Sequence, residues 1–213
     1  MYDQTDVEKI RVFRMVLIQN LAHDLRHGLY SKSKAIFDPD YVGMGSPDVI
    51  NRRDTAQVKC YPDTVVNDYV PFYFAVRTPM LYNIKTGRQV PQRPQEDVVY
   101  LCCRLIDLAT DAFQWCFTDG NAAVAITRFF SDVKDLDQLD WRSIHTDDFR
   151  NDNADGDIDR VRKKHAEFLV KDHVPILHIR AIVVKTTEVQ TKVKTLLAQS
   201  NLGYAFLKQR FQA

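Results

Sequence analysis

The sequence lacks any apolar run near the ~20 residues that a membrane-spanning helix needs. It also lacks a strong net charge, because 29 lysines and arginines against 28 aspartates and glutamates leave a formal charge of +1. A basic surface for nucleic acid must therefore be local. Residues 1–9 are polar and acidic and do not resemble a signal peptide. Together these absences predict a cytoplasmic protein with no membrane partner.

Cysteine and glycine are both scarce, which excludes several common sites. Seven glycines occur among 213 residues, and none of them completes a phosphate-binding GxxxxGK[ST] loop or a GxSxG serine elbow. Gly43 and Gly45 lack the third glycine of a dinucleotide fingerprint. The four cysteines form no CxxC pair and no cluster with histidine, so we expect buried free thiols and no metal site.

What is present is an ordinary globular composition, 45% hydrophobic and 27% charged. One helix is expected to run from an Asn20 cap to Gly28, and another to open at Ser46 and Pro47. No repeat or linker divides the chain, so residues 1–213 are predicted to form a single α+β domain with a strand-rich centre. Extended segments are expected at 12–18, 69–76, 79–84, 98–105, 113–117, 168–170 and 176–184, and helices at 20–28, 46–53, 122–139 and 187–199.

Glu167 stands where a charged loop meets the apolar run 168–170, which predicts the start of a buried strand. A carboxylate that enters such a strand loses water and requires a partner. If a pocket supplies a substrate hydroxyl or a developing cation, Glu167 can do chemistry. In the other interpretation it is an edge-strand glutamate that pairs with Lys163 or Lys164.

The segment 69–82 is rich in aromatic side chains, and strand alternation places Phe72 and Phe74 on one face and Tyr73 on the other. Two interpretations are open: a core strand with an edge, or a stacking floor for a nicotinamide, an adenine or a DNA base.

The hydrophilic segment 151–159 imitates the start of an EF-hand loop, but Arg162 occupies the position where calcium binding requires a glutamate. We interpret the segment as a charged loop. Because it ends shortly before Glu167, it could cover that acid's pocket. Earlier in the chain, Arg52 and Arg53 lie about 100° apart on the expected helix, and an arginine turned inward would suit a phosphate or pyrophosphate.

Seven segments occur in an order that resembles the DarT family of bacterial DNA ADP-ribosyltransferases, the toxins of DarTG toxin–antitoxin pairs. They extend over nearly the whole chain. The segments are Phe13-Arg14-Met15 with Asn20-Leu21 and His27-Gly28-Leu29; Pro47-Asp48-Val49-Ile50-Asn51-Arg52-Arg53; Asp68-Tyr69-Val70-Pro71-Phe72-Tyr73-Phe74; Arg77-Thr78-Pro79-Met80-Leu81-Tyr82; Phe117-Thr118-Asp119; Leu139-Asp140-Trp141; and Ala166-Glu167-Phe168-Leu169-Val170.

The resemblance implies the ADP-ribosyltransferase fold, in which a split central β-sheet with peripheral helices holds NAD+ as a co-substrate. It assigns the catalytic glutamate to Glu167 and the catalytic arginine to Arg53. Contacts with NAD+ are expected from Arg14, Asn20, Tyr73 and Tyr82, with the two tyrosines as walls around nicotinamide. Contacts with the phosphates of single-stranded DNA are expected from Arg162, Lys163 and Lys164.

Two departures from the family pattern bear on the target base. Arg14 and Leu17 stand where the thymidine-modifying branch has histidines, which favours guanine over thymine. The strand motif continues as Ala75-Val76-Arg77 instead of Asn-Pro-Arg. The resemblance therefore predicts a toxin that modifies a base in single-stranded DNA in a sequence-dependent way. A separate macrodomain antitoxin is expected to reverse the modification. Two alternatives are an ADP-ribosyltransferase for protein or RNA, and a non-catalytic nucleic-acid-binding relative.

Overall fold

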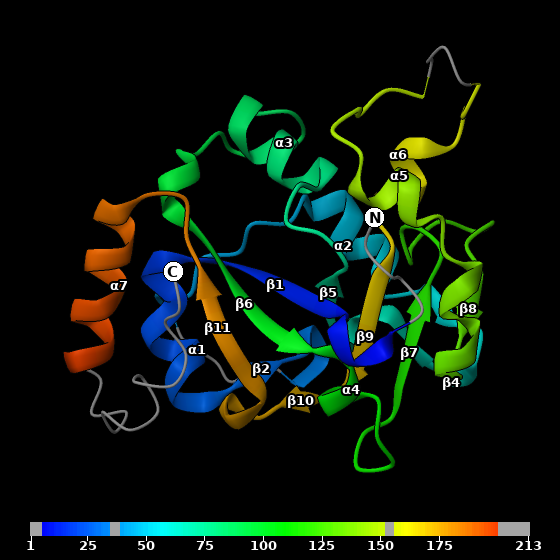
Figure 1. Cartoon of the computed structure of the whole chain (residues 1–213), viewed down its shortest axis with the longest axis horizontal. Coiled ribbons are helices and arrows are strands. Elements are labelled where there is room, and N and C mark those ends of the chain that lie inside the picture. The colour runs from blue at the N-terminus through cyan, green and yellow to red at the C-terminus, as the bar shows by residue number, and fades with distance from the viewer. Residues whose placement is uncertain (1–5, 35–38, 152–155, 200–213) are drawn as a thin grey trace.

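The computed structural model describes residues 6–34, 39–151 and 156–199 and has a seven-stranded antiparallel sheet at its centre (Figure 1). The strands lie in the order β11-β6-β1-β5-β9-β7-β8. β1 pairs with β6 along its whole length, but it pairs with β5 only where Phe13 meets Tyr73, so the sheet divides into two halves there. The strands are β1 (Arg11–Leu17), β5 (Tyr69–Tyr73), β6 (Val98–Arg104), β7 (Trp115–Thr118), β8 (Phe129–Phe130), β9 (Glu167–Lys171) and β11 (Ile179–Val183).

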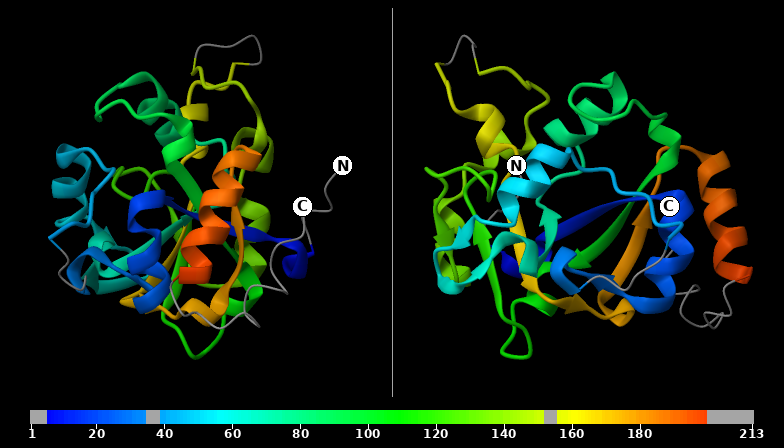
Figure 2. Two further views of the ribbon diagram at one scale, coloured as in Figure 1. Left: turned by 90° about the vertical axis from the view of Figure 1, so that its left-hand side faces the viewer. Right: turned by 180° about the vertical axis from the view of Figure 1, so that it is seen from behind.

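Smaller elements surround this sheet and confirm the predicted α+β class. Two short ladders pair β2 (Leu29–Tyr30) with β10 (His173–Val174), and β3 (Gln57–Val58) with β4 (Tyr61–Val65). Seen from behind, α1 and α2 lie on the near side of the sheet, and α7 stands beside its β11 edge (Figure 2). The helices are α1 (Leu21–His27), α2 (Pro47–Arg53), α3 (Pro79–Thr86), α4 (Leu105–Leu108), α5 (Trp141–His145), α6 (Arg160–Lys163) and α7 (Thr187–Gln199).

Strand alternation gives the two faces of the sheet different partners. Phe72 and Phe74 lie in the largest core cluster together with apolar residues of α1 and α7. On the opposite face, Met15 of β1 lies in a second cluster with Ile84 of α3, and Tyr73 packs against it. The predicted separation of Phe72 and Phe74 from Tyr73 is therefore confirmed. Three of the four cysteines are buried, and all four are free thiols.

Two secondary-structure predictions are wrong, and the first concerns residues 122–139. Their apolar spacing predicts a helix, yet they form turns, β8 and the 3-10 segment Val133–Gln138. Lys59 donates through Nζ to the carbonyls of Ala125 and Thr127, and Thr127 donates through Oγ1 to the carbonyl of Asn121. These side chains take backbone groups that a helix would pair internally, so tertiary contacts override the local pattern.

The second wrong prediction is the extended segment at 79–84, which is the helix α3. The Thr78 side chain accepts a hydrogen bond from the Leu81 N–H, Pro79 occupies the first turn, and Gly87 ends the helix with φ of 72°. These are ordinary helix signals in the sequence. The aromatic, strand-like composition of the residues just before the segment masks them.

Candidate active site

Strand β9 places Glu167 at its first position, in the middle of the sheet. The neighbouring strand β5 sets Tyr73 directly opposite Glu167. The Glu167 N–H donates to Thr118 Oγ1 at 3.1 Å, and Thr118 Oγ1 donates to the Gly120 carbonyl at 2.7 Å. Glu167 is only 2% exposed. The carboxylate is therefore held by backbone geometry on both flanks, as the buried-strand interpretation requires.

Arg53 reaches Glu167 from the end of α2, although the two residues lie far apart in the sequence. Its Nη1 donates to both carboxylate oxygens, at 3.0 and 2.9 Å. The N–H of Ala122 donates to Oε1 at 3.2 Å. Asn67 donates to the Ile50 carbonyl of α2 at 3.1 Å and so fixes the helix that carries the arginine. The structure thus brings together the two residues predicted to be catalytic.

One atom of this pair has no partner within the described part of the chain. Arg53 Nη2 is buried and makes no hydrogen bond there. A buried guanidinium donor that lacks an acceptor is costly. An oxygen of a bound substrate would satisfy it, because ribose hydroxyls and pyrophosphate oxygens are strong acceptors. The corner therefore fits the dinucleotide that the resemblance implies.

Tyr73 and His165 surround the acid with groups that carry no charge near neutral pH. Burial, reinforced by the negative charge of Glu167, raises the pKa of Tyr73 to about 12, so its hydroxyl keeps its proton. Burial lowers the pKa of His165. His165 Nδ1 donates to the Val161 carbonyl at 3.0 Å, which leaves Nε2 as an acceptor. Sequence reasoning assigns no role to His165, although its place two residues before Glu167 puts it beside the acid.

Arg14 and Asn20 lie towards α1, farther along the same side of the molecule. Arg14 is half-buried, and its Nη1 donates to the Pro71 carbonyl at 3.3 Å. Asn20 uses both ends of its amide on the backbone of Val42, at 2.8 and 3.1 Å. It therefore holds the 39–42 segment in place and does not cap α1 with its side chain.

A buried polar group adjoins Arg14. Burial raises the pKa of Asp24 to about 6, although Arg14 and His23 oppose this effect. The ring of His23 lies 4.8 Å from that of His27 and 5.3 Å from that of Tyr41. His23 Nδ1 lies 3.6 Å from Asp24 Oδ1, and within the described chain His23 Nε2 is buried without a hydrogen bond. This end of the site therefore also contains a buried polar atom with unused bonding capacity.

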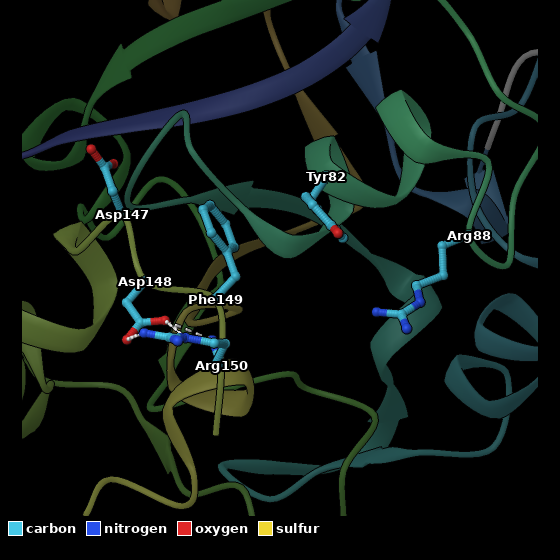
Figure 3. Close-up of a pocket in the computed structure, with 6 residues that line it drawn as sticks. All are labelled: Tyr82, Arg88, Asp147, Asp148, Phe149 and Arg150. Atoms are coloured by element: carbon cyan, nitrogen blue, oxygen red, sulfur yellow. Dashed lines mark hydrogen bonds and ion pairs between the residues drawn. The ribbon is translucent and has the colours of Figure 1, made fainter. Parts of the chain in front are cut away.

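Tyr82, the fourth residue expected to contact NAD+, lies on α3. It projects from α3, is 43% exposed, and stacks on Phe149 with ring centroids 5.9 Å apart (Figure 3). The two rings line a pocket of about 580 Å³ that contains neither Glu167 nor Arg53. Tyr73 is thus opposite Glu167 in the sheet and Tyr82 lines this pocket, and the contact of either tyrosine with NAD+ stays a prediction.

The three basic residues before Glu167 are engaged within the protein. Arg162 contacts Asp119 at 2.7 Å and Asp159 at 2.6 Å. Lys163 contacts Asp140 and Asp157, and burial lowers the pKa of Lys164 to about 8. Lys164 is 2% exposed and donates to the carbonyls of residues 143, 144 and 146. Their contact with DNA phosphates stays a prediction, and Lys164 has a structural role in addition.

The charged loop expected at 151–159 lies partly outside the described residues, since 152–155 are not described. Among the residues that are described, no group of three or more histidine, cysteine, aspartate or glutamate side chains could hold a metal ion. Within the same ranges, no helix is long and apolar enough to cross a bilayer.

Comparison with known proteins decides the family. A family model described as "ssDNA thymidine ADP-ribosyltransferase, DarT" matches residues 13–207. The chain belongs to the DarT family. A DNA ADP-ribosyl transferase of Escherichia coli O127:H6 (strain E2348/69 / EPEC) is 31% identical over 196 residues, which cover 92% of this chain and 89% of that protein. A DNA ADP-ribosyl transferase of Thermus sp. (strain 2.9) is 32% identical over 198 residues, 92% of this chain and 91% of that protein.

Solved DarT structures confirm the ADP-ribosyltransferase fold. Thermus sp. 2.9 DarT in complex with ADP-ribosylated ssDNA matches with a TM-score of 0.81 and 30% identity, over 96% of this chain and 92% of that chain. Thermus sp. 2.9 DarT in complex with NAD+ matches with a TM-score of 0.78 and 29% identity, over 92% of both chains. The family and the fold predicted from seven short segments are thus confirmed, and the description of the family names thymidine.

Proposed function

We propose that this DarT family member transfers ADP-ribose from NAD+ to a base in single-stranded DNA. The observation that carries the proposal is the contact of Arg53 Nη1 with both oxygens of Glu167, at 3.0 and 2.9 Å, in a corner where Arg53 Nη2 still lacks an acceptor among the described residues. Relatives that this chain matches over 92% of its length are DNA ADP-ribosyl transferases. A solved DarT of the same fold binds NAD+, and another structure of it holds ADP-ribosylated ssDNA.

In the proposed reaction, the bond between nicotinamide and ribose breaks, and nicotinamide leaves with the bonding electron pair. Positive charge then develops on the ribose, and the carboxylate of Glu167 stabilises that charge. A base nitrogen forms the new bond to the same ribose carbon. Glu167 accepts the proton that this nitrogen loses, as a general base within hydrogen-bond reach. Single-stranded DNA suits the step because a duplex hides the reacting edge of the base.

In this proposal the other polar residues of the site hold and orient Glu167 and the substrate. Arg53 fixes both oxygens of Glu167 and offers Nη2 to a substrate oxygen. In this proposal Arg14 contacts ribose or pyrophosphate, and Tyr73, opposite Glu167 in the sheet, forms one wall beside the acid. Asn20 acts through the 39–42 backbone that it anchors.

We further propose guanine as the preferred acceptor, because Arg14 and Leu17 replace the histidines of the thymidine-modifying branch. Mass spectrometry of a mixed-sequence oligonucleotide pool, incubated with the protein and NAD+ and digested to nucleosides, tests both parts. An ADP-ribosyl adduct on guanosine supports the whole proposal. An adduct on thymidine retains the enzyme and rejects the base preference. With RNA and protein supplied in parallel, modification of those alone rejects DNA as the acceptor.

The family resemblance also motivates a biological role as the toxin of a pair whose macrodomain antitoxin is a separate chain. Induced expression in a bacterial host tests this role. Growth arrest with the natural sequence and normal growth with Glu167→Gln, at equal protein levels, is the expected result. Equal growth of both cultures contradicts the toxin role and leaves the chemistry in vitro unaffected.

A further inference from the structure

The pocket beside α3 combines two stacked aromatic rings with charged side chains. Tyr82 and Phe149 lie with centroids 5.9 Å apart and an interplanar angle of 21° (Figure 3). A cavity of about 580 Å³ lies within the range of sites for small organic ligands. Its lining residues are Tyr82, Arg88, Asp147, Asp148, Phe149 and Arg150. An exposed aromatic ring in such a setting is a stacking surface for a planar group.

The charges around the pocket favour an anion. Each aspartate has an arginine partner: Asp147 pairs with Arg77, and Asp148 pairs with Arg150 at 2.9 Å. The guanidinium of Arg88 extends towards the space between the two aromatic rings and Arg150 (Figure 3). Within the described chain, Arg88 makes no ion pair with Asp147 or Asp148. Arginine is well suited to a phosphate, because its planar fork presents several donors. A ring to stack on and an available arginine together match a nucleotide.

The pocket adjoins the segment of the chain that leads to Glu167. The Lys164 ammonium lies over the Phe149 ring, 4.5 Å from the ring centroid. Lys164 is three residues before Glu167 in the chain. Yet the pocket lining includes none of Arg53, Tyr73 and Glu167. The pocket and the corner that holds Glu167 are therefore lined by different residues, which favours the DNA acceptor over NAD+ as the source of a nucleotide in this pocket.

We propose that the Tyr82–Phe149 pocket binds a nucleotide of the acceptor strand that neighbours the modified base. The inference rests on the proposed function. The base of that nucleotide stacks on Tyr82, and its phosphate pairs with Arg88. This subsite gives Tyr82 a different role from a nicotinamide wall, and it makes the flanking nucleotide a determinant of which acceptor base is used.

Steady-state modification of a single-stranded oligonucleotide tests the stack. Tyr82→Ala is expected to raise KM for the oligonucleotide about 5- to 100-fold, the range for loss of base–aromatic stacking, and to leave KM for NAD+ unchanged. Tyr82→Phe is the matched control, because it keeps the ring and is expected to stay within about twofold of the natural protein. A Tyr82→Ala variant that raises KM for NAD+ instead would place the adenine of NAD+ in the pocket and overturn the proposal.

Oligonucleotides with one abasic site sharpen the test. Moving the abasic site through the positions around the acceptor should identify one position at which the natural protein loses efficiency. Tyr82→Ala should show no additional loss at that position, because the stacking partner is already absent. If an abasic site lowers the efficiency of Tyr82→Ala by the same factor as that of the natural protein at every position, the subsite is contradicted.

Arg88→Gln tests the phosphate contact. It should reduce the slope of log KM against log salt concentration by about 0.7, the value for one phosphate contact on a single strand. Arg26→Gln, at an exposed arginine of α1, is the matched control and should leave the slope unchanged. If the natural protein modifies no oligonucleotide, the proposed function fails; if it does and all variants equal it, only the subsite fails.

Discussion

Two largely buried arginines, Arg53 and Arg162, use their donors in opposite ways. Arg53 contacts Glu167 through one terminal nitrogen and keeps the other buried without a partner in the described structure. Arg162 uses Nε and Nη2 on Asp159 and Nη1 on Asp119. Both side chains are largely buried, at 12% and 13% exposure. Burial therefore does not distinguish the two arginines, but the unused donor does.

The difference separates the catalytic corner (Arg53, Glu167) from the basic turn (160–164). In the catalytic corner, bonding capacity is left for a ligand. In the basic turn, Arg162 and Lys163 are neutralised by aspartates, and Lys164 is bound to carbonyls. A run of positive charge in the sequence thus makes internal contacts, whereas the pair of Glu167 and Arg53 keeps one donor available for the proposed substrate.

The largest expected effect comes from removing the charge of the acid. Glu167→Gln keeps the shape of the side chain and should lower kcat for DNA modification by about 100- to 1,000-fold, because the developing positive charge loses its counter-charge. Thermal shift with NAD+ should remain, since glutamine keeps a hydrogen-bonding side chain in the site and a ligand that binds the folded state raises its stability. Retention of more than about a tenth of the activity would remove Glu167 from the mechanism.

The next largest expected effect comes from breaking the ion pair between Arg53 and Glu167. Arg53→Gln leaves Glu167 charged and buried without its partner, which should destabilise the protein by about 3 kcal/mol and lower activity about 100-fold. Combining Arg53→Gln with Glu167→Gln should recover most of the stability and none of the activity. Urea unfolding of the three variants measures this cycle. A double variant as unstable as Arg53→Gln would show that the ion pair does not account for the loss.

A smaller effect distinguishes packing from phosphate contact in the basic turn. Arg162→Gln breaks partly buried bonds to Asp119 and Asp159 and should cost about 1–3 kcal/mol of stability. A purely structural role leaves the salt dependence of oligonucleotide KM unchanged. A phosphate contact, as expected from the sequence, reduces that slope by about 0.7. Unfolding curves and salt series on the same variant therefore decide between the two roles.

The smallest expected effect is a difference in how stability depends on pH between variants of the neighbouring lysines Lys163 and Lys164. The folded-state pKa of Lys164 is about 8, below the ordinary 10.5, so the unfolded chain binds the extra proton between these values. Stability of the natural protein relative to Lys164→Met should therefore rise by about 2 kcal/mol as pH increases through this window.

Lys163 is the matched control for that experiment. Burial alone would lower the pKa of Lys163, but hydrogen bonds to Asp140 and Asp157 outweigh burial and raise it above the ordinary 10.5. Its stabilising contribution is fully present below that value, so Lys163→Met should show a constant difference from the natural protein over the same pH window. Denaturant unfolding at three pH values between about 7.5 and 10 measures both variants. If the stability of Lys164→Met instead runs parallel to that of the natural protein across this window, the buried ammonium of Lys164 does not titrate there.

Much of the fold could be predicted because local signals and burial agree. The helix at 187–199 and the strand that begins at Glu167 coincide with their predicted positions. The structure of residues 122–139 could not be predicted, because Lys59, in a distant part of the chain, donates hydrogen bonds to the carbonyls of Ala125 and Thr127. No sequence window that contains the segment also contains this partner.

The site shows the same limit. Glu167 could be found from its position before an apolar run, and Arg53 from the family motif. Thr118 and the Ala122 N–H could not, since they act through backbone geometry that depends on β7 and the turn after it. The sequence groups Tyr82 with Tyr73 because both are aromatic residues of one segment, but the structure places Tyr82 on α3, where it stacks on Phe149.

Arg53 of α2 and Glu167 of β9 are 114 positions apart in the sequence, and β9 lies between β5 and β7 in the sheet. During synthesis on the ribosome, α2 and β5 leave the exit tunnel long before β9 does. A nascent chain that already contains Arg53 therefore has no carboxylate beside it, and the sheet that would hold NAD+ is incomplete. The order of translation therefore delays assembly of the proposed active site until β9 has emerged, and a chain interrupted before β9 lacks the acid of the proposed reaction.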